Sequence, residues 1–189
     1  MDSTGGRCLQ RLIKGNRRFA GSRPLHPNQG ARRRRLIISG QKPFCAVVCC
    51  SDSRVPPELI FDCGLGDLFV VRLAGNVVDN MAIGSLEYAV EHLHIPLIVV
   101  MGHSSCGAVS AALSGKKFGG FVDEVCRAIR PAIGNAKSPD VNDVVKINVR
   151  MITDRLTKTG PVLSRMVKND LLEIVPAYYD LKSWKVELL

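Results

Sequence analysis

Two stretches of the sequence share one design: FCAVVCCSDSR at residues 44–54 and PLIVVMGHSSC at residues 96–106. Each begins with an apolar run typical of a buried β-strand, and each run ends in a polar segment that carries cysteine. In an open parallel sheet, ligands bind in the crevice beyond the carboxyl ends of the strands. The two stretches therefore predict a binding site at that edge of a sheet.

The side chains at these two strand ends are of the kinds that zinc prefers. Cys50 and Asp52 follow the first apolar run, while His103 and Cys106 follow the second, at a strand-to-helix turn. Two thiolates and one imidazole are zinc ligands, and three protein ligands leave a fourth position open for chemistry. His-x-x-Cys alone is also found as a core histidine beside a buried cysteine. In combination with Cys-x-Asp-x-Arg, it predicts a catalytic zinc site.

The rest of the chain predicts an α/β fold. Strands alternate with helices early and helices dominate later, which favours a mainly parallel central sheet of four to five strands flanked by helices. We expect one domain over residues 1–189, in which residues 1–40 form an N-terminal helical arm that packs on a partner subunit. The expected strands are 44–49, 68–71, 97–101 and 172–175, with further strand material at 177–181 and 184–188. The expected helices are 7–20, 56–61, 82–93, 106–113, 121–136, 141–158 and 161–168.

Composition is typical of a globular protein, with 46% hydrophobic and 23% charged residues. No apolar run approaches the roughly 20 residues that span a bilayer, and the first six residues lack the charged-then-apolar order of a secretory signal.

Seven cysteines, mostly in apolar stretches, favour reduced thiols and hence a cytoplasmic location. We expect Cys49 to face the core, because neighbouring side chains of a strand point to opposite faces. Small buried hydrophobic roles are expected for Cys8, Cys45, Cys63 and Cys126.

The net charge of +9 is concentrated in the arginine run 32–35 and the segment before it. Such a run is compatible with nucleic-acid binding. It carries no interleaved aromatic residues and no nucleic-acid-binding motif accompanies it. A solvated helix face or a subunit contact is the interpretation that we prefer.

Six motifs resemble those of the β-class carbonic anhydrase family and follow the order of that family. Together they cover nearly the whole chain. They are CSDSRVPPE (50–58), GDLFVVR (66–72), AGN (74–76), GSLEYAV (84–90), MGHSSCGAV (101–109) and AYYDL (177–181).

The resemblance implies one Zn²⁺ per chain, held by Cys50, His103 and Cys106, with Asp52 and Arg54 as a catalytic dyad. The activity it implies is the reversible hydration of CO₂ to bicarbonate and a proton, by attack of a zinc-bound hydroxide. It also implies a homodimer or a larger oligomer built from dimers. The backbone N–H of Gly107, at the start of a helix, is a candidate donor to the substrate oxygens.

Several alternatives remain open at this point. The same scaffold could hydrolyse CS₂ or COS, or zinc could stabilise a protein that binds anions or nucleic acid through its arginines. The Asp52–Arg54 pair could simply shape its loop, or Asp52 could move onto the metal and close the site. A tryptophan associated with a bicarbonate-stabilised closed form in part of the family corresponds here to Val47. Candidate proton shuttles are Tyr88, His92 and His94.

Overall fold

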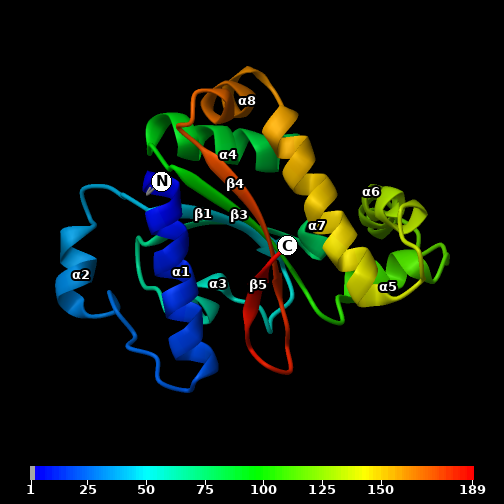
Figure 1. Ribbon diagram of the computed structural model, residues 1–189, viewed down its shortest axis with the longest axis horizontal. Coiled ribbons are helices and arrows are strands. Elements are labelled where there is room, and N and C mark those ends of the chain that lie inside the picture. Colours follow the sequence, from blue (N-terminus) through cyan, green and yellow to red (C-terminus); the bar gives the residue numbers. More distant parts are fainter. Residues whose placement is uncertain (1–2) are drawn as a thin grey trace.

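The computed structural model describes residues 3–189, so the first two residues of the expected N-terminal arm lie outside the described residues. Its sheet has five strands in the order β2-β1-β3-β4-β5, and all neighbours are parallel except β4 and β5 (Figure 1). The predicted fold class is confirmed. The strands are β1 (Cys45–Cys50), β2 (Leu68–Leu73), β3 (Leu97–His103), β4 (Glu173–Tyr179) and β5 (Val186–Leu188).

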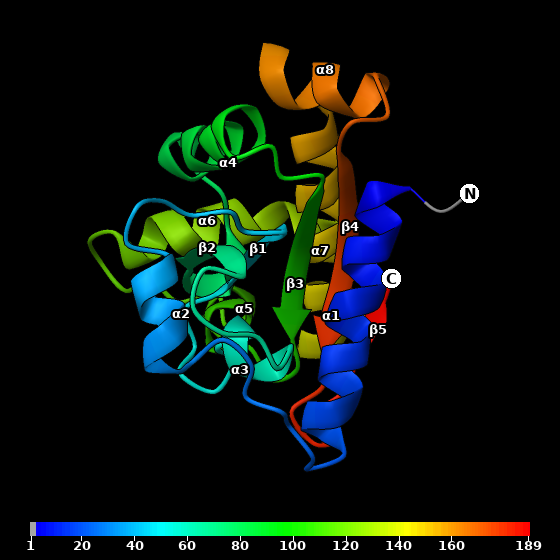
Figure 2. The ribbon, with the colours of Figure 1, turned by 90° about the vertical axis from the view of Figure 1, so that its left-hand side faces the viewer.

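Helices cover both faces of this sheet, with α1 on one side and α7 on the other (Figures 1 and 2). Every residue of β1 and β3 is buried, which explains why these strands are continuous apolar runs. Among residues 3–189, no helix is long and apolar enough to cross a membrane. The helices are α1 (Thr4–Ala20), α2 (Ala31–Leu36), α3 (Pro57–Ile60), α4 (Asn80–His92), α5 (Gly107–Leu113), α6 (Val122–Gly134), α7 (Val141–Lys158) and α8 (Pro161–Lys168), with a 3₁₀ turn, η1 (Ala74–Asn76).

Strand β4 continues through Pro176, where the sequence pattern predicted a break. Proline cannot donate a hydrogen bond and is normally confined to unpaired strand edges. Strand β5 pairs only with residues 177–179, and the carbonyl of Pro176 accepts from Leu189 N on that same side. The ring nitrogen therefore faces Leu189, one residue beyond β5, so the missing N–H removes no bond from the ladder between β4 and β5.

The N-terminal helix α1 is fixed to its own chain through Asn16, which is buried. Its amide nitrogen donates to the carbonyls of Ile60 and Trp184, and its amide oxygen accepts from Val186 N at 2.8 Å. This face of α1 therefore packs on α3 and on the C-terminal turn. That the arm over residues 1–40 also contacts a partner subunit stays a prediction, as does the single domain over residues 1–189.

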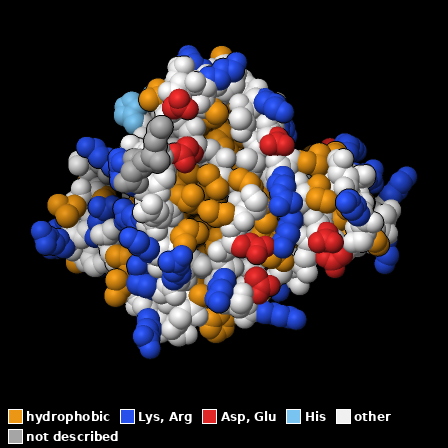
Figure 3. Space-filling model, viewed as in Figure 1, with side chains coloured by type: hydrophobic (Ala, Val, Ile, Leu, Met, Phe, Trp, Pro, Cys, Tyr) orange, Lys and Arg blue, Asp and Glu red, His pale blue; other side chains and the backbone are white. Residues whose placement is uncertain are grey.

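The arginine run forms α2, a helix that the sequence did not predict because it has no apolar stripe. Figure 3 shows basic side chains gathered over α1 and α2. Arg33 donates to the carbonyl of Leu65 at 2.8 Å and lies 3.8 Å from a carboxylate oxygen of Asp67, whereas the other three arginines of the run are exposed.

Candidate metal centre

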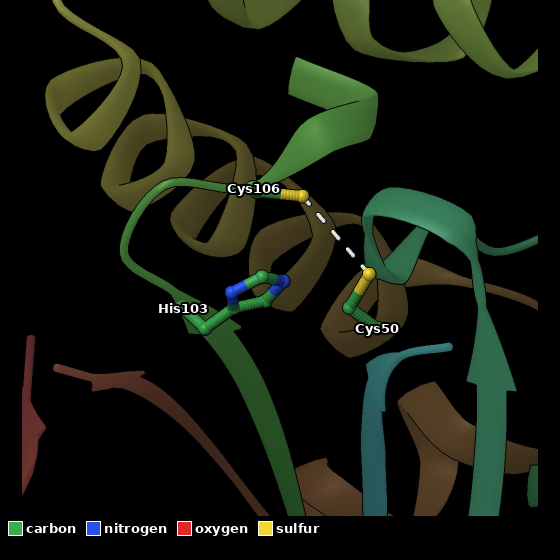
Figure 4. Close-up of side chains that lie close together, drawn as sticks. All are labelled: Cys50, His103 and Cys106. Atoms are coloured by element: carbon green, nitrogen blue, oxygen red, sulfur yellow. Dashed lines mark hydrogen bonds between the residues drawn. The ribbon is translucent and has the colours of Figure 1, made fainter. Parts of the chain in front are cut away.

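Three side chains meet where β1 and β3 end. Strand β1 ends at Cys50, β3 ends at His103, and Cys106 is the N-cap of α5. Their ligand atoms all lie within 4.8 Å of one another, and the two Sγ atoms are 4.0 Å apart (Figure 4). All three residues are at most 5% exposed. The structure thus brings the three predicted ligands to one buried point.

The imidazole of His103 is oriented by a backbone contact. Its Nδ1 lies 2.9 Å from the carbonyl oxygen of Ser104. Because a carbonyl only accepts, Nδ1 carries the proton and Nε2 presents a lone pair. Nε2 is buried and has no hydrogen-bond partner among the described residues. A buried nitrogen without a partner is costly, and a cation between it and the two sulfurs would satisfy it. The donor set therefore fits zinc.

The thiols of Cys50 and Cys106 share one hydrogen bond, which shifts their pKa values in opposite directions. That bond from the Cys106 thiol, with smaller contributions from the backbone N–H groups of Asp52 and Gly75, lowers the pKa of Cys50. The same bond, together with burial, raises the pKa of Cys106. Of the two thiols, Cys50 is therefore the more acidic. A cation would stabilise the second thiolate as well, because coordination deprotonates a thiol.

Asp52 and Arg54 form a bidentate ion pair at the rim of this centre. The guanidinium donates to the two carboxylate oxygens at 3.0 and 2.7 Å. These bonds are the main reason why the pKa of Asp52 falls to about 2. One carboxylate oxygen lies 3.9 Å from Nε2 of His103. The pair therefore presents a permanently ionised acceptor beside the centre.

Arg72, at the end of β2, is a site residue whose role the sequence did not suggest. Its guanidinium donates to the carbonyl of Cys50 at 2.9 Å and to the carbonyl of Asp52 at 2.5 Å. It therefore holds the loop that carries both of these side chains. Its partners are backbone carbonyls, which leave no trace in a sequence. The one sequence signal that could have identified Arg72 was its position at the end of a predicted strand.

The remaining predicted residues take more distant or ordinary positions. Cys49 is fully buried, and burial raises its pKa to about 12. Gly107 is the first residue of α5, beside Cys106. His92 ends α4 before β3 begins, and the ring of Tyr88 lies tilted beside it, with 5.0 Å between ring centroids. In this chain they lie at the opposite end of β3 from His103, roughly 20 Å away for a strand of this length.

Comparison with protein families gives one match over most of the chain. A family model described as carbonic anhydrase matches residues 45–186. The chain is 40% identical over 184 residues to a carbonic anhydrase of Mycolicibacterium smegmatis and to carbonic anhydrase 2 of Mycobacterium tuberculosis. In both cases the match covers 94% of this chain and 89% of the relative.

Solved structures show the same likeness in three dimensions. One of two tetrameric β-carbonic anhydrases from Sordaria macrospora superposes with a TM-score of 0.78 at 27% identity, covering 97% of each chain. A β-carbonic anhydrase from Coccomyxa, in complex with acetazolamide, gives a TM-score of 0.78 at 26% identity over 96% of this chain and 86% of that one.

Proposed function

This chain belongs to the β-carbonic anhydrase family, and we propose that Cys50, His103 and Cys106 hold one Zn²⁺ at which it interconverts CO₂ and bicarbonate. The activity follows from the family and from relatives that match almost the full chain. The observation that supports the metal centre is the buried cluster of two sulfurs and the unpartnered Nε2 of His103. When bound there, zinc supplies a Lewis acid that lowers the pKa of water at its fourth position.

Asp52 orients the attacking water in this proposal. With a pKa of about 2 it is ionised at any pH near neutrality, so it can only accept hydrogen bonds. The carboxylate accepts a hydrogen bond from the O–H of the water, and this leaves the oxygen lone pair directed at the carbon of CO₂.

Arg54 and Gly107 complete the proposed site. Arg54 holds both oxygens of the Asp52 carboxylate, and its Nη2 also lies 3.4 Å from the carbonyl of Ser105. These contacts keep the carboxylate away from the position of the metal. In this proposal the N–H of Gly107, at the start of α5, donates to the substrate oxygens on which negative charge develops.

Assembly and location are part of the same proposal. We propose a homodimer or a dimer-based oligomer in which the arm over residues 1–40 lies across the partner. The tetrameric relatives from Sordaria macrospora support an oligomer. A cytoplasmic location is supported by the seven cysteines, all of which are unpaired in the structure.

The alternatives are less well supported. Hydrolysis of CS₂ or COS and binding of anions or nucleic acid were both compatible with the motifs. The curated relatives described above are carbonic anhydrases, and this similarity favours hydration of CO₂ over either alternative.

Metal analysis and stopped-flow CO₂ hydration on the purified protein test the proposal together. We expect about one zinc per chain, a hydration rate that a chelator abolishes, and recovery of the rate when zinc is restored. Only a trace of zinc, or hydration that a chelator does not affect, would contradict the proposal. Sulfide release from CS₂ or COS, measured on the same sample, addresses the alternative substrates.

A further inference from the structure

One face of α7 lies behind the metal centre and contacts the segments that carry two of its ligands. The side-chain oxygen of Asn142 accepts from the backbone N–H of Ser105 at 2.9 Å, directly before Cys106. One turn later, α7 packs on Gly102, directly before His103. A Cβ atom at Gly102 would lie 2.6 Å from methyl carbons of both Val145 and Val149. The backbone of β3 thus approaches α7 as closely as glycine permits.

Asn148, on the same face of α7, contacts the segment beside the third ligand. Its Nδ2 donates to the carbonyl of Gly75 at 3.1 Å, in a buried bond. The N–H of Gly75 in turn donates to Sγ of Cys50 at 3.2 Å. Asn148 is only 3% exposed. A buried amide therefore restrains the residue whose backbone touches the sulfur of Cys50.

Gly75 directs its N–H at the sulfur in a left-handed backbone conformation that favours glycine. Its φ is +64°, and a Cβ atom there would lie 2.8 Å from Cδ1 of Ile129 and 3.1 Å from Cβ of Ala108. Glycine is permissive and adopts other conformations as readily. The bond from Asn148 to its carbonyl is a contact that selects this one.

We infer that Asn148 is a positioning residue of the metal centre, which acts through Gly75 on the sulfur of Cys50. The inference rests on the proposed function, since it concerns the strength with which Cys50 binds zinc. An N–H bond to a thiolate withdraws electron density from the sulfur and fixes the direction of its lone pairs. Such outer contacts orient the ligands and tune the metal.

The test compares Asn148→Leu with the wild type in two measurements that do not depend on activity. Zinc affinity, from competition with a chromophoric chelator, should weaken by about 10- to 100-fold. In the Co²⁺-substituted protein, the thiolate-to-cobalt charge-transfer band should move to longer wavelength, because a sulfur without its N–H bond holds its electrons less tightly.

Thr153→Val is the matched control. Thr153 is buried on the same helix, and its hydroxyl donates to the carbonyl of Val149 within α7. This variant tests whether any loss of a buried polar group from α7 affects the metal. We expect its zinc affinity and its cobalt band to equal those of the wild type.

Asn148→Ser serves if the leucine variant does not fold, because its hydroxyl is too short to reach the carbonyl of Gly75. Variants that lose stability but keep the wild-type zinc affinity and cobalt band would overturn the inference. A T153V protein that changes both as much as N148L would also overturn it. If the wild type binds no zinc, the proposed function fails instead.

Discussion

Asp52 accepts three hydrogen bonds from Arg54, one from its backbone N–H at 2.9 Å and two from its guanidinium. The two residues are separated by a single position, so the pair closes within one loop and needs no other element to form. The loop is fixed separately, by Arg72. Arg54 thus keeps the carboxylate ionised, and Arg72 fixes the loop that carries it.

Arg54→Gln should raise the pKa of Asp52 from about 2 toward its ordinary value of about 3.9. A carboxylate whose pKa is depressed on folding stabilises the protein above the unfolded pKa, and this contribution is lost as the pH falls through the folded pKa. The free-energy advantage of the wild type over R54Q should be constant above about pH 5 and shrink below about pH 4. Urea unfolding of the metal-free proteins at several pH values measures it.

Arg34→Gln is the control for this experiment. Arg34 is exposed on α2 and pairs with no carboxylate among the described residues. The free-energy difference between wild type and R34Q should therefore stay constant across the pH range where Asp52 titrates. An advantage of wild type over R54Q that grows on acidification would contradict the assigned direction of the pKa shift.

Cys50→Ala and His103→Ala should each remove both the metal and the hydration activity, because a catalytic zinc site needs three protein ligands and only two would remain. Metal content by mass spectrometry and stopped-flow hydration measure the two effects on one sample. Cys126→Ala removes a buried thiol on α6 and should keep both. Retention of stoichiometric zinc by C50A or H103A would contradict the proposed ligand set.

Asp52→Ala should separate binding of the metal from catalysis. The three proposed ligands remain, so much of the zinc should remain, whereas the hydration rate should fall by about 10²-fold, because the attacking water loses the group that orients it. Zinc content and kcat/KM are measured together. A D52A protein with the wild-type rate would leave the Asp52–Arg54 pair only a role in shaping its loop.

Gly102→Ala should destabilise the protein by about 1–3 kcal/mol, since its Cβ would overlap two valines of α7. Denaturant unfolding measures the loss. Gly40→Ala, in open space in a loop, should be neutral or slightly stabilising, within about 1 kcal/mol. Equal effects of the two substitutions would mean that α7 can move away from β3 without cost.

The sequence predicted the sheet and the edge where the ligands meet because both depend on signals carried by single segments. Buried parallel strands are continuous apolar runs, and the polar residues that follow β1 and β3 must lie at the same edge. The helix α2 gave no such signal, since none of its residues is buried. Pro176 gave a misleading signal. Proline predicts a break in a strand, but whether a strand tolerates it depends on where the neighbouring strand ends, which the local sequence does not contain.

Contacts that support the site from other elements could not be predicted. Asn148 and Gly75 are 73 positions apart, and the acceptor is a backbone carbonyl that any residue would offer. The same holds for Arg72 and the carbonyls of Cys50 and Asp52. Ligand types are visible in a sequence, whereas the groups that aim them become visible only when the chain is folded.

The bonds of Asn16 have a consequence for synthesis of the chain. Asn16 accepts from Val186 and donates to the carbonyl of Trp184, which are translated 170 and 168 residues after it. Helix α1 is therefore synthesised long before the segment that satisfies its buried amide. Until that segment emerges from the ribosome, the amide of Asn16 stays hydrated and α1 cannot complete its packing.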